Sequence, residues 1–162
     1  MNKRNIILIG MPGAGKSSVG VILAKVLGYE FIDTDLVIQH REKRLLREII
    51  ADEGNEGFLA IENEVNATLE ADKSVIAPGG SAIYGKEAME HFKEIGTIVY
   101  LKLSYEDLAK RLGNLKGRGV VLKEGQTLKD LYDERSKLYE QYAEITVDES
   151  GRDIPVSYTH LR

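Results

Sequence analysis

The stretch that decides the fold reads Gly10-Met11-Pro12-Gly13-Ala14-Gly15-Lys16-Ser17, which matches the pattern G-x-x-x-x-G-K-[S/T] in full. The apolar run 6–9 precedes it and a stretch of helical period, residues 18–27, follows it, so a buried strand ends in a glycine loop that opens a helix. In that setting successive backbone N–H groups and the helix N-terminus face one anion. We therefore predict that the loop binds nucleotide phosphates, with Lys16 on the β- and γ-phosphates and the Ser17 hydroxyl on Mg²⁺. The alternative is a glycine-rich strand–helix turn that arose by chance.

The composition narrows the class of protein. A length of 162 residues suits a single domain, and a formal net charge of −4 without a dense Lys/Arg run disfavours nucleic acid as a partner. The chain has no cysteine, so it can form neither a disulfide nor a thiolate metal site. Its longest apolar run near the N-terminus is too short to cross a bilayer and lacks the cleavage site of a signal peptide. We therefore expect a cytoplasmic monomer that binds small molecules and no membrane.

Apolar runs alternate with amphipathic segments along the whole chain. Five runs are predicted as strands: 6–9, 29–33, 74–77, 97–103 and 144–148. The segments between them are predicted as helices: 17–27 capped by Gly28, 36–52 in two pieces, 58–70, 86–94, 105–112, and 127–142 with Thr127 as its N-cap. Strands that alternate with helices imply right-handed crossovers. The predicted fold is therefore α/β, with a five-stranded parallel sheet covered on both faces in three α/β/α layers.

One domain is expected over residues 1–154, because no repeat or linker interrupts the pattern. Residues 113–126 are rich in glycine and basic residues and show little apolar periodicity, so we predict a mobile lid there. The last residues, 155–162, read Pro155-Val156-Ser157-Tyr158-Thr159-His160-Leu161-Arg162 and resemble the translation of a sequencing adapter. We expect this tail to be non-native, the alternative being an ordinary polar tail, and we assign no role to His160.

Ligands of a parallel sheet bind at the carboxyl ends of its strands, which makes the strand ends the expected place of the chemistry. The second predicted strand ends in Asp33-Thr34-Asp35. Two carboxylates at this spacing point the same way, so one suits Mg²⁺, directly or through water, and the other suits a substrate hydroxyl. An Asx turn or a helix N-cap would use the same tripeptide.

Three further features suit the binding of phosphate or of an acid. The third predicted strand ends in Pro78-Gly79-Gly80-Ser81, where glycine lets backbone N–H groups approach a ligand, although a plain turn needs the same residues. Arg118 lies between two glycines of the predicted lid and could fold over a transferring phosphate. Arg135 lies on the helix after the lid, and arginine binds a carboxylate through two parallel hydrogen bonds. Either arginine could instead be a solvated surface charge.

Taken in order, these features resemble the shikimate kinases, a family with a short P-loop kinase fold. The shared features are the phosphate loop, the Asp-x-Asp after the second strand, the glycine turn after the third, a lid that carries an Arg, and a final signature of Arg135, Tyr139 and Ala143. Their order and spacing match up to Ile154. The resemblance implies transfer of the γ-phosphoryl group of Mg²⁺·ATP to a hydroxyl of a small carboxylic acid. Shikimate, which would become shikimate 3-phosphate, is the leading acceptor.

The resemblance also implies roles for single residues. ATP would be bound by the loop and by two arginines: Gly10, Met11, Pro12, Gly13, Ala14, Gly15, Lys16, Ser17, Ser18, Arg111, which would lie against the adenine, and Arg118. Mg²⁺ would be held by Ser17 and Asp33, directly or through water. The acceptor would be bound by Asp35, Gly79, Gly80 and Arg135, with Arg135 on its carboxylate. Lys16 and Arg118 would act in catalysis by neutralising phosphate charge, and Asp35 by binding the attacking hydroxyl, which it could deprotonate.

Departures from the family pattern concern mainly the acceptor. In the family the helix after the second strand carries a Phe-Arg pair before a Glu, and the Arg is a second contact to the acceptor carboxylate. Here that stretch reads Phe58-Leu59-Ala60-Ile61-Glu62, so the Arg is missing. Loss of such a charge-assisted contact costs about 1.5–3 kcal/mol. In addition, Ser81 replaces the third glycine of the turn, and Gly119 replaces the Pro that follows the lid Arg.

Two other functions stay open on the sequence alone. Leu59 and Ser81 favour a related small-molecule kinase with a changed acceptor, such as a gluconate-type sugar acid. The missing Arg also leaves open a nucleotide-binding module without catalysis, although such a module would not require all the phosphate-handling residues together. A second cationic side chain beside Arg135 in the acceptor pocket, for instance Arg44 or Arg47 from the preceding helix, would favour a carboxylic acid as acceptor.

Overall fold

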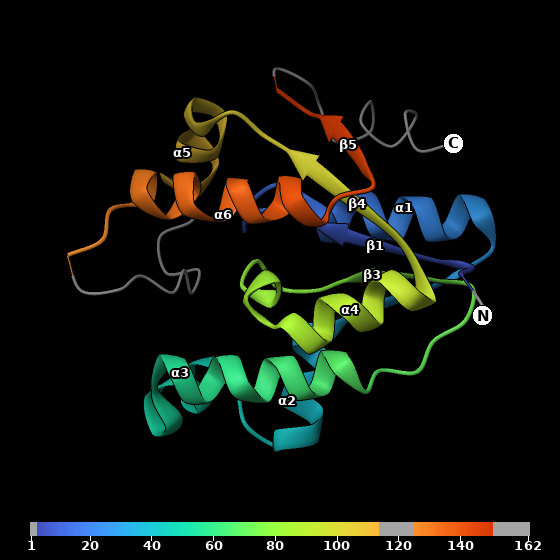
Figure 1. Cartoon of the computed structure of the whole chain (residues 1–162), viewed down its shortest axis with the longest axis horizontal. Helices are drawn as coiled ribbons and strands as arrows, with labels where there is room; N and C mark the ends of the chain where they lie inside the picture. The colour runs from blue at the N-terminus through green and yellow to red at the C-terminus, as the bar shows by residue number, and fades with distance from the viewer. Residues whose placement is uncertain (1–2, 114–124, 151–162) are drawn as a thin grey trace.

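A computed structural model describes residues 3–113 and 125–150 of the chain (Figure 1). Five strands form one sheet in the order β2-β3-β1-β4-β5, and all neighbours in it are parallel. The strands are β1 (Asn5–Ile9), β2 (Glu30–Asp33), β3 (Ser74–Ala77), β4 (Gly96–Lys102) and β5 (Ile145–Asp148). The predicted five-stranded parallel sheet is thus confirmed, and the strand that leads into the phosphate loop lies in its centre.

Helices connect the strands throughout the described residues. They are α1 (Lys16–Leu27), α2 (Thr34–Glu42), α3 (Leu46–Ala67), α4 (Lys86–Ile95), α5 (Tyr105–Gly113), α6 (Leu128–Tyr142) and the 3₁₀ helix η1 (Ala82–Tyr84). The predicted caps are also confirmed, since Gly28 ends α1 and the side chain of Thr127 accepts a hydrogen bond from the backbone N–H of Asp130 at the start of α6. The sequence pattern does not predict η1, because three residues are too few to show a helical period.

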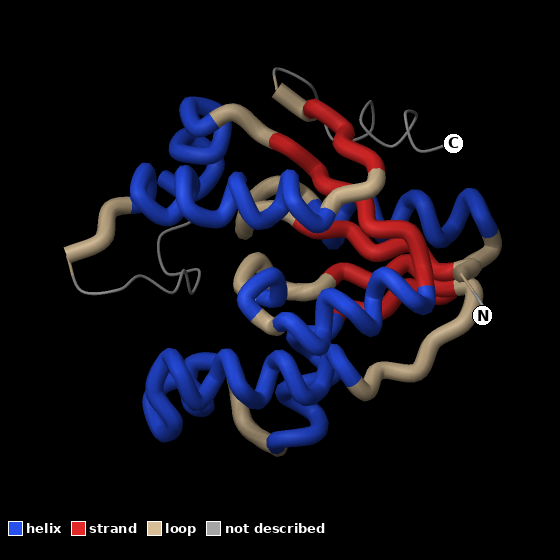
Figure 2. Tube along the Cα trace, viewed as in Figure 1, coloured by secondary structure: helices blue, strands red, loops and turns tan. Residues whose placement is uncertain are grey.

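Both faces of the sheet are covered, which explains why its strands are almost continuously apolar. In the central strand β1, Leu8 packs with Leu23 of α1 on one face. Ile7 and Ile9 pack on the other face with a second group of helices, to which α4 contributes Phe92. Figure 2 shows the resulting arrangement, with the strands in red between layers of helix in blue. The three-layer α/β/α architecture predicted from the alternation of strands and helices is therefore confirmed.

Helices α2 and α3 form a separate apolar cluster beside this sandwich. Its buried residues are Ile38, Ile49, Phe58 and Val65. The main contacts of α3 are with α4, α2 and η1 (Figure 1). Helix α3 packs against α4 and η1. Its first turns therefore lie near the carboxyl ends of β1 and β3, where the phosphate loop and the glycine turn begin.

A kink at Gly54 bends α3. The φ and ψ angles of Gly54 are 75° and 175°, a combination that is essentially restricted to glycine. The sequence predicts separate helices over 36–52 and 58–70, whereas the structure joins the second piece of the first to the next helix through a kink at Gly54, with Gly57 inside the helix. The bend directs the first part of α3, which carries Leu46 and Ile50, over the cavity described below.

The predicted lid and tail lie largely outside the described residues. Residues 114–124 include Arg118 and most of the lid, and residues 151–162 include the whole tail. The extent of the domain, the lid and the non-native character of residues 155–162 therefore stay predictions.

We expect Gly54→Ala to destabilise the protein more than Gly28→Ala. Neither position has a heavy atom within 4 Å of an added Cβ, so the two substitutions compare backbone strain alone. Gly28 has φ 71° and ψ 31°, a left-handed conformation that costs other residues about 1–2 kcal/mol, whereas the essentially glycine-only conformation of Gly54 costs up to about 3 kcal/mol. Thermal unfolding measures both losses. Gly28→Asn is the control, because asparagine tolerates the left-handed region, and equal losses at the two alanine variants would contradict the expected strain at Gly54.

Candidate active site

The phosphate loop presents a buried cation at the end of β1. Lys16 is the first residue of α1 and only 9% of it is exposed. Its Nζ donates hydrogen bonds to the carbonyl oxygens of Gly10 at 2.8 Å and of Met11 at 3.0 Å. The ammonium therefore lies inside the loop at the N-terminus of α1, where the partial positive charge of the helix adds to its own. An anion that enters the loop meets both charges together, which is the geometry predicted from the sequence.

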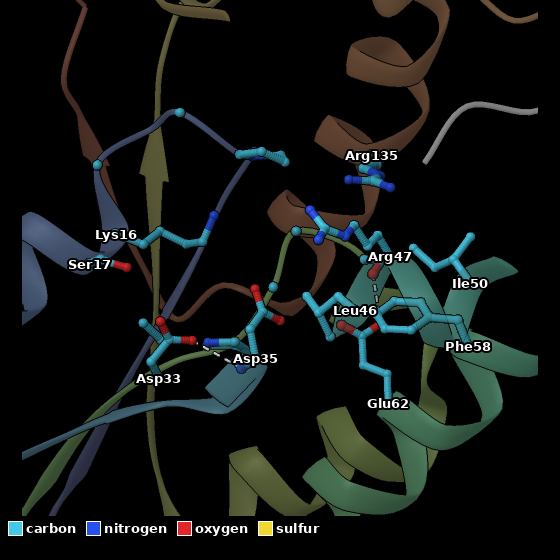
Figure 3. A pocket seen from close by; sticks show the side chains of 18 of the residues that line it. Lys16, Ser17, Asp33, Asp35, Leu46, Arg47, Ile50, Phe58, Glu62 and Arg135 are labelled. Carbon is cyan, nitrogen blue, oxygen red and sulfur yellow. Dashed lines mark hydrogen bonds between the residues drawn. The ribbon is translucent and has the colours of Figure 1, made fainter. Parts of the chain in front are cut away.

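A cavity of about 700 Å³ opens beside this loop (Figure 3). Most of the site residues predicted from the sequence line it: Pro12, Gly13, Gly15, Lys16, Ser17, Ser18, Asp33, Asp35, Gly79, Gly80 and Arg135. They come from the ends of three neighbouring strands and from α6. The tertiary structure thus brings together the residues predicted for phosphate, metal and acceptor, which lie as far apart in the chain as Pro12 and Arg135.

Four residues predicted to bind ATP do not line this cavity: Gly10, Met11, Ala14 and Arg111. The first three belong to the loop itself, and the side chain of Met11 is buried in the core. Arg111, on α5, donates a hydrogen bond from its NH1 group to the carbonyl of Gly13 at 3.1 Å, so it lies against the outside of the loop. Contact of these residues with ATP stays a prediction, as does any role of Arg118, which lies outside the described residues.

Asp33 and Asp35 lie where β2 passes into α2, and both line the cavity. Asp33 is the N-cap of α2, and its Oδ1 accepts a hydrogen bond from the backbone N–H of Asp35 at 2.9 Å. The N-cap interpretation of the tripeptide is therefore correct for Asp33. The cap uses one carboxylate oxygen and fixes the two acidic residues relative to each other, so capping and ligand binding are compatible here.

The basicity of Asp35 is raised by its surroundings. Burial raises its pKa to about 6, the negative charge of Asp33 adds to the increase, and the ammonium of Lys16 opposes it. A carboxylate with this pKa is still ionised at pH 7, yet it is a stronger base than an exposed aspartate. Asp35 is therefore suited to accept the proton of a hydroxyl group bound in the cavity.

A further carboxylate of the cavity, Glu62, is almost fully buried, and no sequence motif predicts a role for it. The hydroxyl of Ser81 donates a hydrogen bond to its Oε1 at 2.6 Å, whereas its Oε2 is buried without a partner. Burial raises the pKa of Glu62 to about 7, and the charge of Asp35 adds to the increase, against the hydrogen bond from Ser81 and the charges of Arg135 and Lys16. One sequence signal points to this residue, because Glu62 lies four residues after Phe58 on the buried face of α3.

The glycine turn after β3 fits tightly between these acidic groups and Arg135. A Cβ atom on Gly79 would lie 2.9 Å from Oδ1 of Asp35 and 3.1 Å from Oε2 of Glu62. A Cβ atom on Gly80 would lie 2.7 Å from Cδ of Pro12 and 3.0 Å from NH1 of Arg135. Side chains at these two positions would fill the space between the phosphate loop and α6.

Arg135 is held in the wall of the cavity by its neighbours on α6 and η1. Only 2% of the residue is exposed, its guanidinium carbon lies 5.5 Å from the ring centre of Tyr84, and its Nε is buried without a hydrogen-bond partner. One turn further along α6, the hydroxyl of Tyr139 donates a hydrogen bond to the carbonyl of Gly80 at 2.6 Å. This contact ties α6 to the glycine turn, so Arg135 and the turn form one rigid wall.

A second arginine, Arg47, also lines the cavity. Figure 3 shows its side chain reaching from the start of α3 into the same region as Arg135, opposite the group formed by Lys16 and Asp33. Arg44 does not line the cavity and instead forms ion pairs with Glu42, Asp52 and Glu53. Of the two cationic candidates that the sequence offered, the structure therefore places Arg47 in the cavity.

Fold and site together define a class of protein. A parallel sheet in the order β2-β3-β1-β4-β5, a phosphate loop at its central strand, and carboxylates and guanidinium groups around one cavity define a P-loop phosphotransferase of small molecules. Among the described residues, no helix is both long enough and apolar enough to cross a membrane.

Comparison with known proteins gives the family. Residues 12–161 match the family model described as shikimate kinase. A shikimate kinase 2 of Yersinia enterocolitica is 34% identical over 154 residues, which cover 90% of this chain and 86% of that protein. A shikimate kinase from Acinetobacter baumannii, solved in complex with shikimate, is 32% identical and superposes with a TM-score of 0.86 over 97% of this chain and 89% of that one. A shikimate kinase from Aquifex aeolicus is 29% identical and superposes with a TM-score of 0.77 over 97% of this chain and 92% of that one.

The chain belongs to the shikimate kinase family. It is therefore a kinase that uses ATP as its co-substrate and a hydroxyl group as acceptor. This membership confirms the resemblance drawn from the sequence and argues against a nucleotide-binding module without catalysis.

We expect Glu62→Gln to raise the thermal stability of the protein at pH 8 and to raise it less at pH 5. The pKa of Glu62 is raised on folding from 4.5 to about 7, so the folded protein binds this proton more tightly than the unfolded chain. In the unmodified protein, the stability that comes from this tighter proton binding is fully present below about pH 4.5 and is lost as the pH rises through about 7. Glutamine avoids the buried charge and still accepts the hydrogen bond from Ser81.

Thermal unfolding of both proteins between pH 5 and pH 8 measures this difference. Glu64→Gln is the matched control, because Glu64 lies exposed on the same helix and pairs with Arg41. A gain in stability that does not depend on pH, or an equal gain in the control, would contradict the buried charge of Glu62.

Proposed function

We propose that this protein transfers the γ-phosphoryl group of ATP to a hydroxyl of shikimate and so forms shikimate 3-phosphate. The observation that carries the proposal is the composition of one cavity, in which the phosphate loop, the base Asp35 and the guanidinium of Arg135 face one another. The cavity volume of about 700 Å³ suits a small acid together with the end of a nucleotide. The relative from Acinetobacter baumannii, which was solved with shikimate, supports the choice of acceptor.

In the proposed reaction the acceptor hydroxyl attacks the γ-phosphorus, and the bond from that phosphorus to the bridging oxygen of ADP breaks. The hydroxyl proton passes to Asp35, whose raised pKa of about 6 makes it a competent base at neutral pH. Lys16 and the N-terminus of α1 neutralise charge on the phosphates, since a loose transition state needs positioning and electrostatic stabilisation more than covalent help. Backbone groups of Gly79 and Gly80 contact the acceptor, and Arg135 binds its carboxylate.

Mg²⁺ fits the donor set at one side of the cavity. The hydroxyl of Ser17 and the carboxylate of Asp33 are hard oxygen ligands, and both line the cavity beside Lys16 (Figure 3). Within residues 3–113 and 125–150 no group of three or more His, Asp or Glu side chains could hold a metal ion. Mg²⁺ normally completes its shell with phosphate oxygens and water, so two protein ligands are sufficient. When bound, the ion would neutralise phosphate charge next to the residues that position the acceptor.

The predicted roles of Arg111 and Arg118 complete the proposal. Arg118 would close over the phosphates from the predicted lid and exclude water, which otherwise competes as acceptor. Arg111 already contacts the outside of the phosphate loop, which supports its predicted place against the adenine. A gluconate-type acid is the alternative acceptor, because it also offers a carboxylate and hydroxyl groups. An assay of ADP release with shikimate, gluconate and nucleoside monophosphates separates these acceptors, and release with gluconate alone would overturn the choice of shikimate.

We expect Lys16→Ala to lower kcat for ATP and shikimate by about 100-fold or more, because it removes the cation that faces the phosphates. Steady-state ADP release measures the loss, and circular dichroism checks that the fold is retained. Lys25→Ala is the matched control, since Lys25 is an exposed residue in the last turn of the same helix. A folded Lys16→Ala variant with near-normal turnover would refute the phosphate role of Lys16.

We expect Asp35→Asn to lower kcat by about 100-fold or more while the affinity for ATP changes little. The substitution keeps the shape of the side chain and removes the base that accepts the hydroxyl proton. Turnover and ATP binding are measured separately, the latter by calorimetric titration. Asp133→Asn, at an exposed position of α6, is the control for the loss of one acidic group. Equal losses of ATP affinity and turnover would contradict a role of Asp35 on the acceptor.

A further inference from the structure

Both arginines of the cavity lie at the end away from Lys16, Asp33 and Asp35, while Glu62 lies between the glycine turn and α3 (Figure 3). The carboxylates of Asp33, Asp35 and Glu62 face the phosphate loop and the glycine turn. The guanidinium groups of Arg47 and Arg135 reach the cavity from α3 and α6, away from Lys16 (Figure 3). The two guanidinium groups favour a ligand carboxylate at their end of the cavity, which leaves the end at Asp35 and the phosphate loop for a hydroxyl group.

Within the part of the chain that the structure describes, the side chain of Arg47 forms no hydrogen bond and no ion pair. This contrasts with Arg41 and Arg44, which precede it closely in the chain. Arg41 pairs with Glu64 at 2.7 Å, and Arg44 pairs with three acidic side chains at 2.9–3.2 Å. An exposed arginine in this acidic neighbourhood can readily find an ion pair, and Arg47 instead extends over the cavity (Figure 3).

The position of Arg47 in α3 does not stabilise the helix. It lies in the first turn, where the partial positive charge of the helix disfavours a cation by about 0.3–1 kcal/mol. The neighbouring Glu48 has the opposite, favourable sign, and its side chain accepts a hydrogen bond from the backbone N–H of Leu45 at 3.0 Å. Stability of the helix therefore explains why a glutamate stands at position 48, but it does not explain why an arginine stands at position 47.

Other side chains of α3 leave room for this guanidinium. Leu59, which stands where the family carries an arginine, does not line the cavity and packs against the apolar cluster of α2 and α3. Leu46 and Ile50, the neighbours of Arg47 in the first turns of α3, form an apolar wall beside it. Two guanidinium groups that face one cavity repel each other unless an anion lies between them.

We propose that Arg47 binds the carboxylate of the acceptor together with Arg135, and so determines that this kinase selects an acid. The inference rests on the proposed function, because it concerns the acceptor that Asp35 activates. The buried Arg135 forms the fixed side of this carboxylate site, and the exposed Arg47 forms the side that the acceptor passes on entering. With its carboxylate held between the two, the acceptor turns a hydroxyl group toward Asp35 and the phosphate loop.

The test compares Arg47→Ala with the unmodified protein on two acceptors, shikimate and its uncharged methyl ester, at saturating ATP. We expect Arg47→Ala to raise the KM for shikimate by about 10- to 100-fold, since a charge-assisted contact is lost, and to change the KM for the ester by less than about threefold. The KM for ATP should stay unchanged. Arg47→Lys should recover part of the affinity, because lysine keeps the charge without the planar pair of donors.

Arg41→Ala is the matched control, because it removes the same charge from a nearby exposed position that does not line the cavity. It should leave both acceptor KM values unchanged. The melting temperature of Arg47→Ala should equal or exceed that of the unmodified protein, since the substitution removes a cation from the first turn of α3. A structural role of Arg47 would instead lower the melting temperature.

The outcomes separate the two proposals. A shikimate KM that is unchanged in Arg47→Ala, or that rises equally for the ester and in Arg41→Ala, overturns the role of Arg47 and leaves the proposed function intact. Absence of ADP release with shikimate in the unmodified protein overturns the proposed function, and the role of Arg47 in binding that acid falls with it. A selective rise of the shikimate KM supports both.

Discussion

The site depends on the contact between the ammonium of Lys16 and the carbonyl groups of Gly10 and Met11, at 2.8 and 3.0 Å. These bonds close the phosphate loop around a buried charge. The loop is anchored on one side by β1, which is buried on both faces in the centre of the sheet, and on the other by α1. A close-packed core does not let such a strand shift, so the loop is a fixed reference point for the other groups of the site.

The carboxylates of the cavity lower the stability of the fold, while the same surroundings make them stronger bases. Glu62 is buried and Asp35 is partly buried beside it, and their pKa values rise to about 7 and about 6. A fold selected for stability alone would not hold two acids beside each other with so little contact to water. Lys16 and Arg135 compensate part of this cost, and the hydroxyl of Ser81 compensates another part. Ser81, which replaces a glycine of the family pattern, therefore has a structural role next to Glu62.

Residues at the ends of strands could be assigned from the sequence, and residues on α3 could not. Asp33, Asp35, Gly79 and Gly80 follow apolar runs directly, and parallel strands place all such ends at one edge of a sheet. Which side chains of α3 face that edge depends on the kink at Gly54 and on its packing against α4 and η1. These contacts join segments far apart in the chain, and no local pattern records them.

By itself the sequence determined the α/β fold, the phosphate loop and the acidic pair at a strand end, because strand and helix periods and the loop motif are local properties of the chain. The place of Arg135 in the site was expected from the resemblance to the family. Only the tertiary structure decided which second arginine reaches the cavity. Arg44 is neutralised by three acidic neighbours, while Leu59 is drawn into the apolar cluster of α2 and α3. Arg47 faces the cavity instead, because the apolar side chains of α3 pack against α2 and so fix how the helix is turned about its axis.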